Sequence, residues 1–293
     1  MRVAPERMRI AIVRQRYNPY GGAERFIERA LPALERSGVD VSLIARSWQS
    51  GATRWETRKV VLVNPPYAGN LWRDRSFARA AKRAWEAGNF DLVQSHERIP
   101  GCDIYRAGDG VHARWLEIRR AAADQLERLG IALNPYHRYT CAAERRMFEH
   151  PRLRAVICNS NMVREEIRQA FRVAPEKLHV IYNGVDLRFF HPGRRAHLRD
   201  ATRAELGVGA LEFVFLFVGS GFARKGLDAA IGALARCKDE AFRLVVAGRD
   251  SHSGRFAAQA RAAGVGDRVR FLGGREDVSS LYAAAECFIL PTR

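Results

Sequence analysis

Short apolar runs alternate with stretches of helical periodicity along almost the whole chain. Runs such as Ala155–Cys158 are continuous rather than alternating, which is typical of strands buried on both faces. Strand–helix alternation predicts parallel sheets joined by right-handed crossover helices. The expected strands are Met8–Gln15, Val39–Ala45, Val60–Val63, Asp91–Gln94, Asp103–Ala107, Ala155–Cys158, Leu178–Tyr182, Glu212–Val218, Phe242–Ala247, Val269–Leu272 and Cys287–Leu290.

This alternation starts twice. The first series closes at Asn183-Gly184-Val185-Asp186, and a polar, arginine-rich connector then runs to about Leu211 before a new series begins. We therefore predict an α/β chain of two Rossmann-like, doubly wound parallel-sheet domains, the second incomplete. The expected boundaries are 1–185 for the first domain, 186–211 for the linker and 212–293 for the second domain. Ligands of such sheets bind beyond the carboxyl ends of the strands.

Composition excludes several classes of protein. No apolar run reaches the ~18 residues that a membrane span needs, and the polar residues before Met8 contain no signal-peptide core. The five cysteines form no C-x-x-C pair, so neither a disulfide framework nor a zinc site is expected, and a reducing cytoplasm fits. No Asp-x-Asp or His-x-His spacing occurs, so we expect no metal and no other cofactor.

The net charge is +17, and only five of the 49 basic residues are lysine. Such a charge favours anionic partners, namely nucleic acid, anionic lipid or phosphate-bearing substrates. The arginines are spread along the chain and accompany no nucleic-acid-binding motif, so we expect no nucleic acid. Codon bias towards arginine on solvated faces is the alternative origin of the charge.

The second domain opens with a glycine-rich loop between a strand and a helix, which contains Gly219, Gly221, Arg224 and Lys225. Leu227 stands where a Walker A loop needs Lys-Ser/Thr, and Arg224 stands in place of the third glycine of the dinucleotide fingerprint. The loop instead offers two cations beside a helix N-terminus. We predict that they neutralise a diphosphate leaving group; the alternative is a solvated basic turn.

Two further loops follow expected strands. Gly21 and Gly22 lie between the first strand and its helix, where glycine lets the backbone approach an anion at the helix N-terminus. A tight turn is the alternative. After Val269–Leu272, the loop with Arg275, Asp277 and Val278 could present backbone groups to a nucleobase, and Asp277 could equally be a helix N-cap.

Polar side chains also follow strands of the first domain. His96 comes after Asp91–Gln94, and Asp109 and His112 come after Asp103–Ala107. Asp109 could orient a sugar hydroxyl or an acceptor, since it lies at a ligand-binding edge. A structural role is the alternative for both histidines.

The next segment, residues 112–133, has the pattern of a basic amphipathic helix. Its apolar stripe, which we call the 112–133 stripe, consists of Trp115, Ile118, Ala122, Leu126, Leu129 and Leu133, and Arg114, Arg119, Arg120 and Arg128 flank it. Such a helix can lie on an anionic membrane surface. A helix packed on the protein's own core is the alternative.

Together these segments resemble glycosyltransferase family 4, and within it the lipopolysaccharide core glucosyltransferases. They occur in family order and at roughly family spacing over nearly the whole chain. The strings are Gly21-Gly22-Ala23-Glu24-Arg25, Ala107-Gly108-Asp109, Asn183-Gly184-Val185-Asp186, Gly219-Ser220-Gly221-Phe222-Ala223-Arg224-Lys225-Gly226 and Gly273-Gly274-Arg275-Glu276-Asp277-Val278.

The resemblance implies a GT-B fold, a nucleotide-sugar donor (UDP-glucose as the first candidate), retention of anomeric configuration without a metal, and a glycolipid acceptor. It implies that Gly22 approaches the donor phosphate, that Arg224 and Lys225 hold the diphosphate, that Arg275–Val278 meets the base and that Asp109 lies on the sugar side. It also implies that the segment after Asp109 contacts the inner membrane, so that the protein is cytoplasmic or peripheral there.

One departure from the family is large. Members carry two glutamates separated by seven residues after the strand that is here Cys287–Leu290, and this sequence ends at Arg293. We therefore expect a fragment with little transferase activity. The alternative in a different class is a non-catalytic remnant that binds a nucleotide or a membrane.

Overall fold

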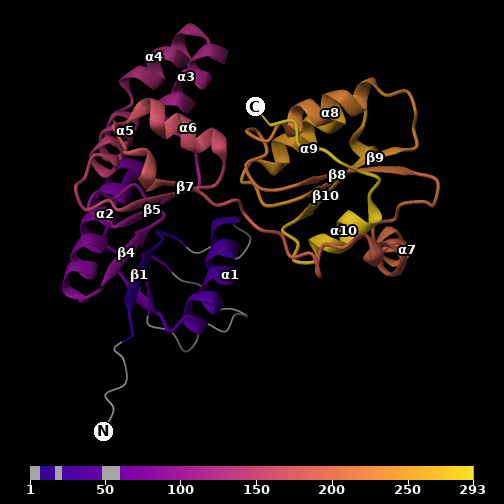
Figure 1. The fold of residues 1–293 in the computed structure, drawn as a ribbon. Helices are drawn as coiled ribbons and strands as arrows, with labels where there is room; N and C mark the ends of the chain where they lie inside the picture. The colour runs from indigo at the N-terminus through magenta and orange to yellow at the C-terminus, as the bar shows by residue number, and fades with distance from the viewer. Residues whose placement is uncertain (1–6, 17–21, 48–59, 293) are drawn as a thin grey trace. The chain divides into compact units, whose positions relative to one another are not determined.

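A computed structural model describes residues 7–16, 22–47 and 60–292 (Figure 1). The chain divides into two compact units, Met1–Gly184 and Val185–Arg293. Each unit is built on a parallel β-sheet flanked by helices. The α/β class and the two doubly wound domains predicted from the sequence are confirmed.

The sheet of the first unit has the order β3-β2-β1-β4-β5-β6-β7, and all its strand pairs are parallel. The strand order reverses between β1 and β4, and such a reversal is where doubly wound sheets open a ligand crevice. The strands are β1 Arg9–Val13, β2 Asp40–Ala45, β3 Val60–Leu62, β4 Leu92–Ser95, β5 Ile104–Ala107, β6 Ala155–Cys158 and β7 Leu178–Val180.

Alternate residues of β1 pack on opposite layers of helices. Ile10 and Ile12 belong to a core cluster with Ile27 of helix α1, whereas Ala11 belongs to a second cluster with Phe77 of helix α2. Period-two alternation thus buries both faces of the strand. The helices of this unit are α1 Gly22–Arg36, α2 Gly69–Ala87, α3 His112–Ala122, α4 Gln125–Leu133, α5 Pro135–Phe148 and α6 Asn161–Ala170, and a 3-10 turn, η2, covers Pro175–Lys177.

The sheet of the second unit has the order β10-β9-β8-β11, again all parallel, with its reversal between β8 and β11. Phe217 packs with α8 and α9 on one side, and Leu216 packs with α10 on the other. The elements are η3 Pro192–Arg194, α7 Arg195–Glu205, β8 Phe213–Val218, α8 Leu227–Arg236, β9 Phe242–Ala247, α9 Ser253–Ala262, η4 Gly266–Arg268, β10 Val269–Gly273, α10 Val278–Ala284 and β11 Cys287–Phe288.

Each of the eleven strands in the described part of the chain lies within or close to its predicted range. The segment expected as a plain linker, residues 186–211, differs because it contains α7, which packs against α10. Arg195, Arg199 and Arg203 occur at four-residue intervals on α7, and all three contact the carboxylate of Glu286. These charge-assisted contacts hold α7 on the second unit, together with the buried Leu206 that follows the helix. Over the described residues, no helix combines the length and apolarity that a membrane span requires.

Candidate functional site

The glycine-rich loop of the second unit follows β8, at the reversal of its sheet. Gly219 and Gly221 both have positive φ, +139° and +76°, a backbone region that glycine enters without steric cost. The loop then forms its own turn, in which Lys225 N–H donates to the Gly221 carbonyl over 3.1 Å. Helix α8 therefore begins only at Leu227, and the two cations lie in the turn before it.

Lys225 folds back over this loop. A Cβ at Gly219 would lie 1.8 Å from Lys225 Nζ, so the absent side chain makes room for the ammonium group. Burial lowers the pKa of Lys225, and the nearby charge of Arg224 lowers it further. Arg224 is exposed, and within the described residues neither cation pairs with a carboxylate. The loop therefore presents two uncompensated positive charges.

The neighbouring loop after β9 fixes the glycine loop in place. A Cβ at Gly248 would lie 2.2 Å from the Gly219 carbonyl oxygen, so the two backbones approach more closely than any other residue would allow. Asp250 Oδ2 accepts a 2.8 Å bond from Phe222 N–H. Although burial opposes it, that bond and one from His252 N–H lower the pKa of Asp250.

The loop after β10 is held by ion pairs. Arg275 bonds Asp277 through Nε and Nη2, each over 2.7 Å, and its Nη1 lies 2.8 Å from Glu205 of α7. The carboxylates of Asp277 and Glu205 raise the pKa of Arg275. Asp277 does occupy the N-cap position of α10, but its side chain makes no capping hydrogen bond because it is committed to Arg275. Val278, the first residue of that helix, is buried.

In the first unit, Gly21 lies outside the described residues, and Gly22 is the first residue of α1. Asp109 is exposed in the loop after β5. Two carboxylates anchor the end of this loop: Glu166 accepts from Val111 N–H over 3.0 Å, and Glu144 accepts from His112 N–H over 3.0 Å. Both were missed in the sequence, where each is one acidic residue in an ordinary helical pattern.

Glu144 also pairs with Arg98, whose Nε lies 2.9 Å from Glu144 Oε1. Burial acts against the charge of Arg98, but Tyr105, Glu144 and Asp109 together raise its pKa. Asp109 therefore lies within electrostatic reach of a buried ion pair, which orders the loop that carries it.

The two histidines are buried to different extents: His96 is buried and His112 is partly buried. His96 lies 2.9 Å from Gln94 Nε2, and burial, with Arg106 and Arg14, lowers its pKa to about 3. His112 begins α3, and its Nε2 lies 3.2 Å from His137 Nδ1. Burial, with Arg98 and His137, lowers the pKa of His112 to about 4. Both rings are therefore neutral at neutral pH.

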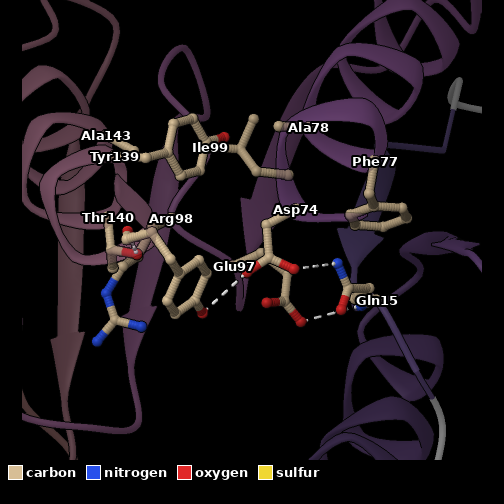
Figure 2. A pocket seen from close by; sticks show the side chains of 11 residues that line it. Gln15, Asp74, Phe77, Ala78, Glu97, Arg98, Ile99, Tyr139, Thr140 and Ala143 are labelled. Carbon is tan, nitrogen blue, oxygen red and sulfur yellow. Dashed lines mark hydrogen bonds between the residues drawn. The ribbon is translucent and has the colours of Figure 1, made fainter. Parts of the chain in front are cut away.

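A pocket lies at the β1/β4 reversal of the first sheet, between α2 and α5 (Figure 2). Asp74 accepts from Gln15 Nε2 over 3.1 Å and from Tyr136 Oη over 3.0 Å. Glu97 Oε1 accepts from Gln15 N–H over 2.9 Å. None of these residues was predicted, although the position of Glu97 after β4 was the available signal.

The 112–133 stripe divides between two helices instead of one. The break falls at Ala123 and Asp124, where Asp124 caps α4 by accepting from Glu127 N–H. Five of its side chains, Trp115, Ile118, Leu126, Leu129 and Leu133, are exposed, from 42% at Trp115 to 83% at Leu126. A small core formed by Leu116, Ala123 and Ile131 lies beneath the two helices. The alternative left open by the sequence, a helix packed on the protein's own core, is therefore met by these other residues of α3 and α4, and the stripe itself lies outside that core.

Comparisons with known proteins agree with this architecture. Residues 20–189 match the family model for Glycosyltransferase Family 4, and residues 199–293 match that for Glycosyl transferases group 1. The lipopolysaccharide glucosyltransferase WaaG of Escherichia coli (strain K12) is 26% identical over 97% of this chain and 74% of its own length. A D-inositol 3-phosphate glycosyltransferase of Mycobacterium sp. (strain KMS) is 28% identical over 93% of this chain, which spans 65% of that relative.

Solved structures give the same result. The crystal structure of WaaG, a glycosyltransferase involved in lipopolysaccharide biosynthesis, superposes with a TM-score of 0.86 at 25% identity, covering 97% of this chain and 75% of that one. The structure of Anabaena HepE in complex with UDP-glucose superposes with a TM-score of 0.67 at 22% identity, covering 96% of this chain and 73% of that one, which supports the fold alone. The two parallel sheets are those of the GT-B fold, and the Glycosyltransferase Family 4 model matches more than half of the residues. The chain therefore belongs to glycosyltransferase family 4.

Proposed function

We propose that the second unit binds a UDP-sugar, with UDP-glucose as the first candidate, and that the protein takes part in retaining transfer of the hexose to a glycolipid such as a lipopolysaccharide core. The observation that carries this proposal is the pair of uncompensated cations, Arg224 and Lys225, at the β8/β11 reversal. Ligands of doubly wound sheets bind at such a reversal. The UDP-glucose complex of the similarly folded HepE supports the choice of donor.

The chemistry follows from charge. When a glycosidic bond to a nucleotide diphosphate breaks, negative charge builds on the phosphate oxygens, and fixed cations stabilise it. Lys225 is held over Gly219 before any ligand arrives, so little ordering remains to be done on binding. Because the two side chains supply the positive charge, the proposal includes no metal ion. Backbone groups at Arg275–Val278 are proposed to meet the base, and Asp109 the sugar or acceptor.

The test is the affinity of UDP for the R224A/K225A double variant, measured by calorimetry. Each lost charge-assisted contact is worth about 1.5–3 kcal/mol, so the affinity should fall by about 100-fold or more. R236A/K238A is the matched control, since it removes one arginine and one lysine that are exposed elsewhere in the same unit. Equal UDP affinity in the wild type and R224A/K225A would refute the proposal.

Binding is the primary readout because the chain spans 74% of the length of WaaG and 65% of the inositol phosphate relative. Turnover of UDP-glucose on the same preparation separates the two classes of function. Measurable UDP binding with transfer to a glycolipid supports an active transferase, whereas binding without transfer supports a non-catalytic nucleotide-binding protein.

We also propose that the exposed 112–133 stripe binds an anionic membrane and brings the first unit to a lipid-linked acceptor. Leu126 and Leu133 are 83% and 70% exposed, and burying such side chains at a bilayer surface stabilises binding by about 25 cal/mol for each Å² of apolar area. Flanking arginines such as Arg120 and Arg128 add attraction to anionic lipids. The protein would then be cytoplasmic and peripheral on the membrane.

Sedimentation with vesicles tests the membrane proposal. Wild type should bind vesicles of phosphatidylglycerol more tightly than vesicles of phosphatidylcholine. The affinity of L126D/L133D for the phosphatidylglycerol vesicles should be at least about tenfold lower than that of wild type. L211D, at a still more exposed leucine of the second unit, is the control. Undiminished vesicle binding by L126D/L133D would contradict the proposal.

A further inference from the structure

The loop after β9 lies between the two loops that the proposed donor site uses. In the second sheet, β9 is hydrogen-bonded to β8 on one side and to β10 on the other (Figure 1). Neighbouring strands are about 4.8 Å apart, so the ends of β8 and β10 are separated by about 10 Å. A nucleotide whose diphosphate meets Arg224 and Lys225 and whose base meets Arg275–Val278 therefore crosses the loop after β9.

This middle loop is joined to both of its neighbours. Gly248 N–H, directly after β9, donates to the Gly273 carbonyl over 2.7 Å, and the backbone of Gly248 also approaches the Gly219 carbonyl closely. Asp250 accepts a 2.8 Å bond from a backbone N–H of the glycine-rich loop. Arg249 stands between Gly248 and Asp250, so its backbone is fixed on both sides.

The side chain of Arg249 extends from this loop to the loop after β10. It is exposed, and a Cβ built on Gly274 would lie 2.7 Å from Arg249 Nε, 3.1 Å from its Cγ and 3.2 Å from its Cδ. Consecutive atoms of the side chain therefore lie along the bare backbone of Gly274. That glycine follows β10, on the opposite side of β9 from the glycine-rich loop, so Arg249 lies on the base side of the proposed donor site.

A guanidinium group in this position suits the flat ring of a base. The group is planar and weakly hydrated, so it stacks on aromatic rings, and its charge is attracted to the face of the ring. The stem of Arg249 already rests on Gly274, so less side-chain freedom remains to be lost when a ligand binds.

We propose that Arg249 stacks on the base of the nucleotide, and that it thereby makes the second unit prefer a nucleoside diphosphate to bare pyrophosphate. The inference rests on the proposed function and adds a side chain that recognises the nucleoside half of the donor. Gly274 is a positioning residue here, because the stem of Arg249 occupies the space that a side chain at this position would fill.

The experiment compares UDP with inorganic pyrophosphate by calorimetry on the full chain. R249A should lower the affinity for UDP about tenfold, as expected for one stacked base, and should change that for pyrophosphate by less than about twofold. R249K keeps the charge but not the planar group, so its UDP affinity should fall nearly as far. R255A, which removes an exposed arginine of α9, is the matched control and should bind both ligands as wild type does.

Three results with these variants would overturn the inference. Equal losses of UDP and pyrophosphate affinity in R249A would make Arg249 a third cation for the diphosphate. Wild-type UDP affinity in R249A would show that the side chain does not contact the nucleotide. Wild-type UDP affinity in R249K would show that charge, and not a planar group stacked on the base, is what the ligand requires.

G274A tests how Arg249 is positioned. The new Cβ would displace the side chain of Arg249, so the affinity for UDP should fall about as far as in R249A. In the R249A background, G274A should cause no further loss, since the side chain that it displaces is absent. A further loss in the double variant would show that Gly274 acts on the ligand directly, and the positioning role would be wrong.

The R224A/K225A variant separates this inference from the proposed function. It should weaken both UDP and pyrophosphate, because it removes the two charges that are proposed to meet the diphosphate. If R224A/K225A loses affinity for both ligands while R249A binds UDP as wild type does, this inference alone is rejected. If neither variant changes the affinity for UDP, the proposed donor site is rejected as well.

Discussion

The two units hold the loops at the carboxyl ends of their strands by different means. In the first unit, buried carboxylates anchor the loops: Glu144 and Glu166 accept backbone N–H groups on either side of the loop that carries Asp109. In the second unit, the backbones of the loops after β8 and β9 approach closely at Gly219 and Gly248, and one carboxylate, Asp250, accepts from Phe222 N–H. Loops at equivalent places in the same fold can thus be held by charged side chains or by the close approach of glycine backbones.

This difference decides which charges remain for a ligand. In the first unit, carboxylates accept hydrogen bonds from backbone N–H, guanidinium and phenol groups of the protein itself. These carboxylates therefore orient the protein's own groups. In the second unit, Asp250 meets a backbone N–H, and Lys225 and Arg224 have no acidic partner among the described residues. Unpaired cations over a glycine backbone suit a diphosphate, whereas anchored carboxylates suit hydroxyl groups.

The largest loss of stability should come from G248A in the second unit, where backbones of neighbouring loops approach closely. Gly248 has φ of +152°, and the new Cβ would lie 2.2 Å from a carbonyl oxygen that cannot move freely. Strain at positive φ and overpacking each cost about 1–3 kcal/mol, so we expect a loss of about 4 kcal/mol. G232A in α8 is the control: nothing lies within 4 Å of its Cβ, and Gly-to-Ala in a helix should stabilise by about 0.5–1 kcal/mol.

The sequence itself provides the readout. All five tryptophans, Trp48, Trp55, Trp72, Trp85 and Trp115, lie in the first unit. In urea titrations of G248A, the circular dichroism should therefore show an early transition that tryptophan fluorescence does not. A loss of stability below about 1 kcal/mol in G248A would contradict the close backbone approach.

The next largest loss of stability should come from E144A in the first unit, where buried carboxylates anchor the loops. Removing the buried carboxylate leaves Arg98 without its partner, and breaking a buried ion pair costs about 3–5 kcal/mol. Arg98 retains 25% exposure of its side chain, so we expect the lower end, about 3 kcal/mol, in the transition followed by tryptophan fluorescence.

E144Q is the conservative control for this prediction. Its amide oxygen can still accept from His112 N–H, so only the charge is lost, and the cost should be about half that of E144A. If E144Q and E144A were equally destabilising, charge would be the whole effect; if both left fluorescence-detected stability unchanged, the first unit would not be held by charge.

The sequence predicted much of the fold because burial leaves a local signature. Apolar, β-branched runs located the eleven strands of the described residues, and the glycine loop after Val218 was recognisable because positive φ demands glycine within a few residues. The helix in residues 195–205 was missed because it is held by arginines that contact Glu286, which lies more than eighty residues away in the chain. A contact of that range leaves no local pattern.

The candidate site was predictable in the second unit and not in the first. Arg224 and Lys225 are neighbours in one loop, so the sequence alone indicates that they lie close together in space. Asp74, Glu97 and Tyr136 come from three different elements, and only the strand order brings them together. Whether Gly21 approaches a phosphate stays a prediction, since it lies outside the described residues.

The smallest of the three effects is a pH dependence confined to the first unit. His96 has a pKa near 3 in the folded protein, against about 6.5 unfolded, so the unfolded chain binds its proton first as pH falls. Stability is therefore fully present above pH 6.5 and is lost progressively below it, by about 2 kcal/mol at pH 5. The fluorescence-detected stability of H96N should fall less steeply over this interval than that of wild type. H179N, at an exposed histidine, should keep the wild-type slope, and an H96N slope equal to that of wild type would show that other groups cause the acid sensitivity.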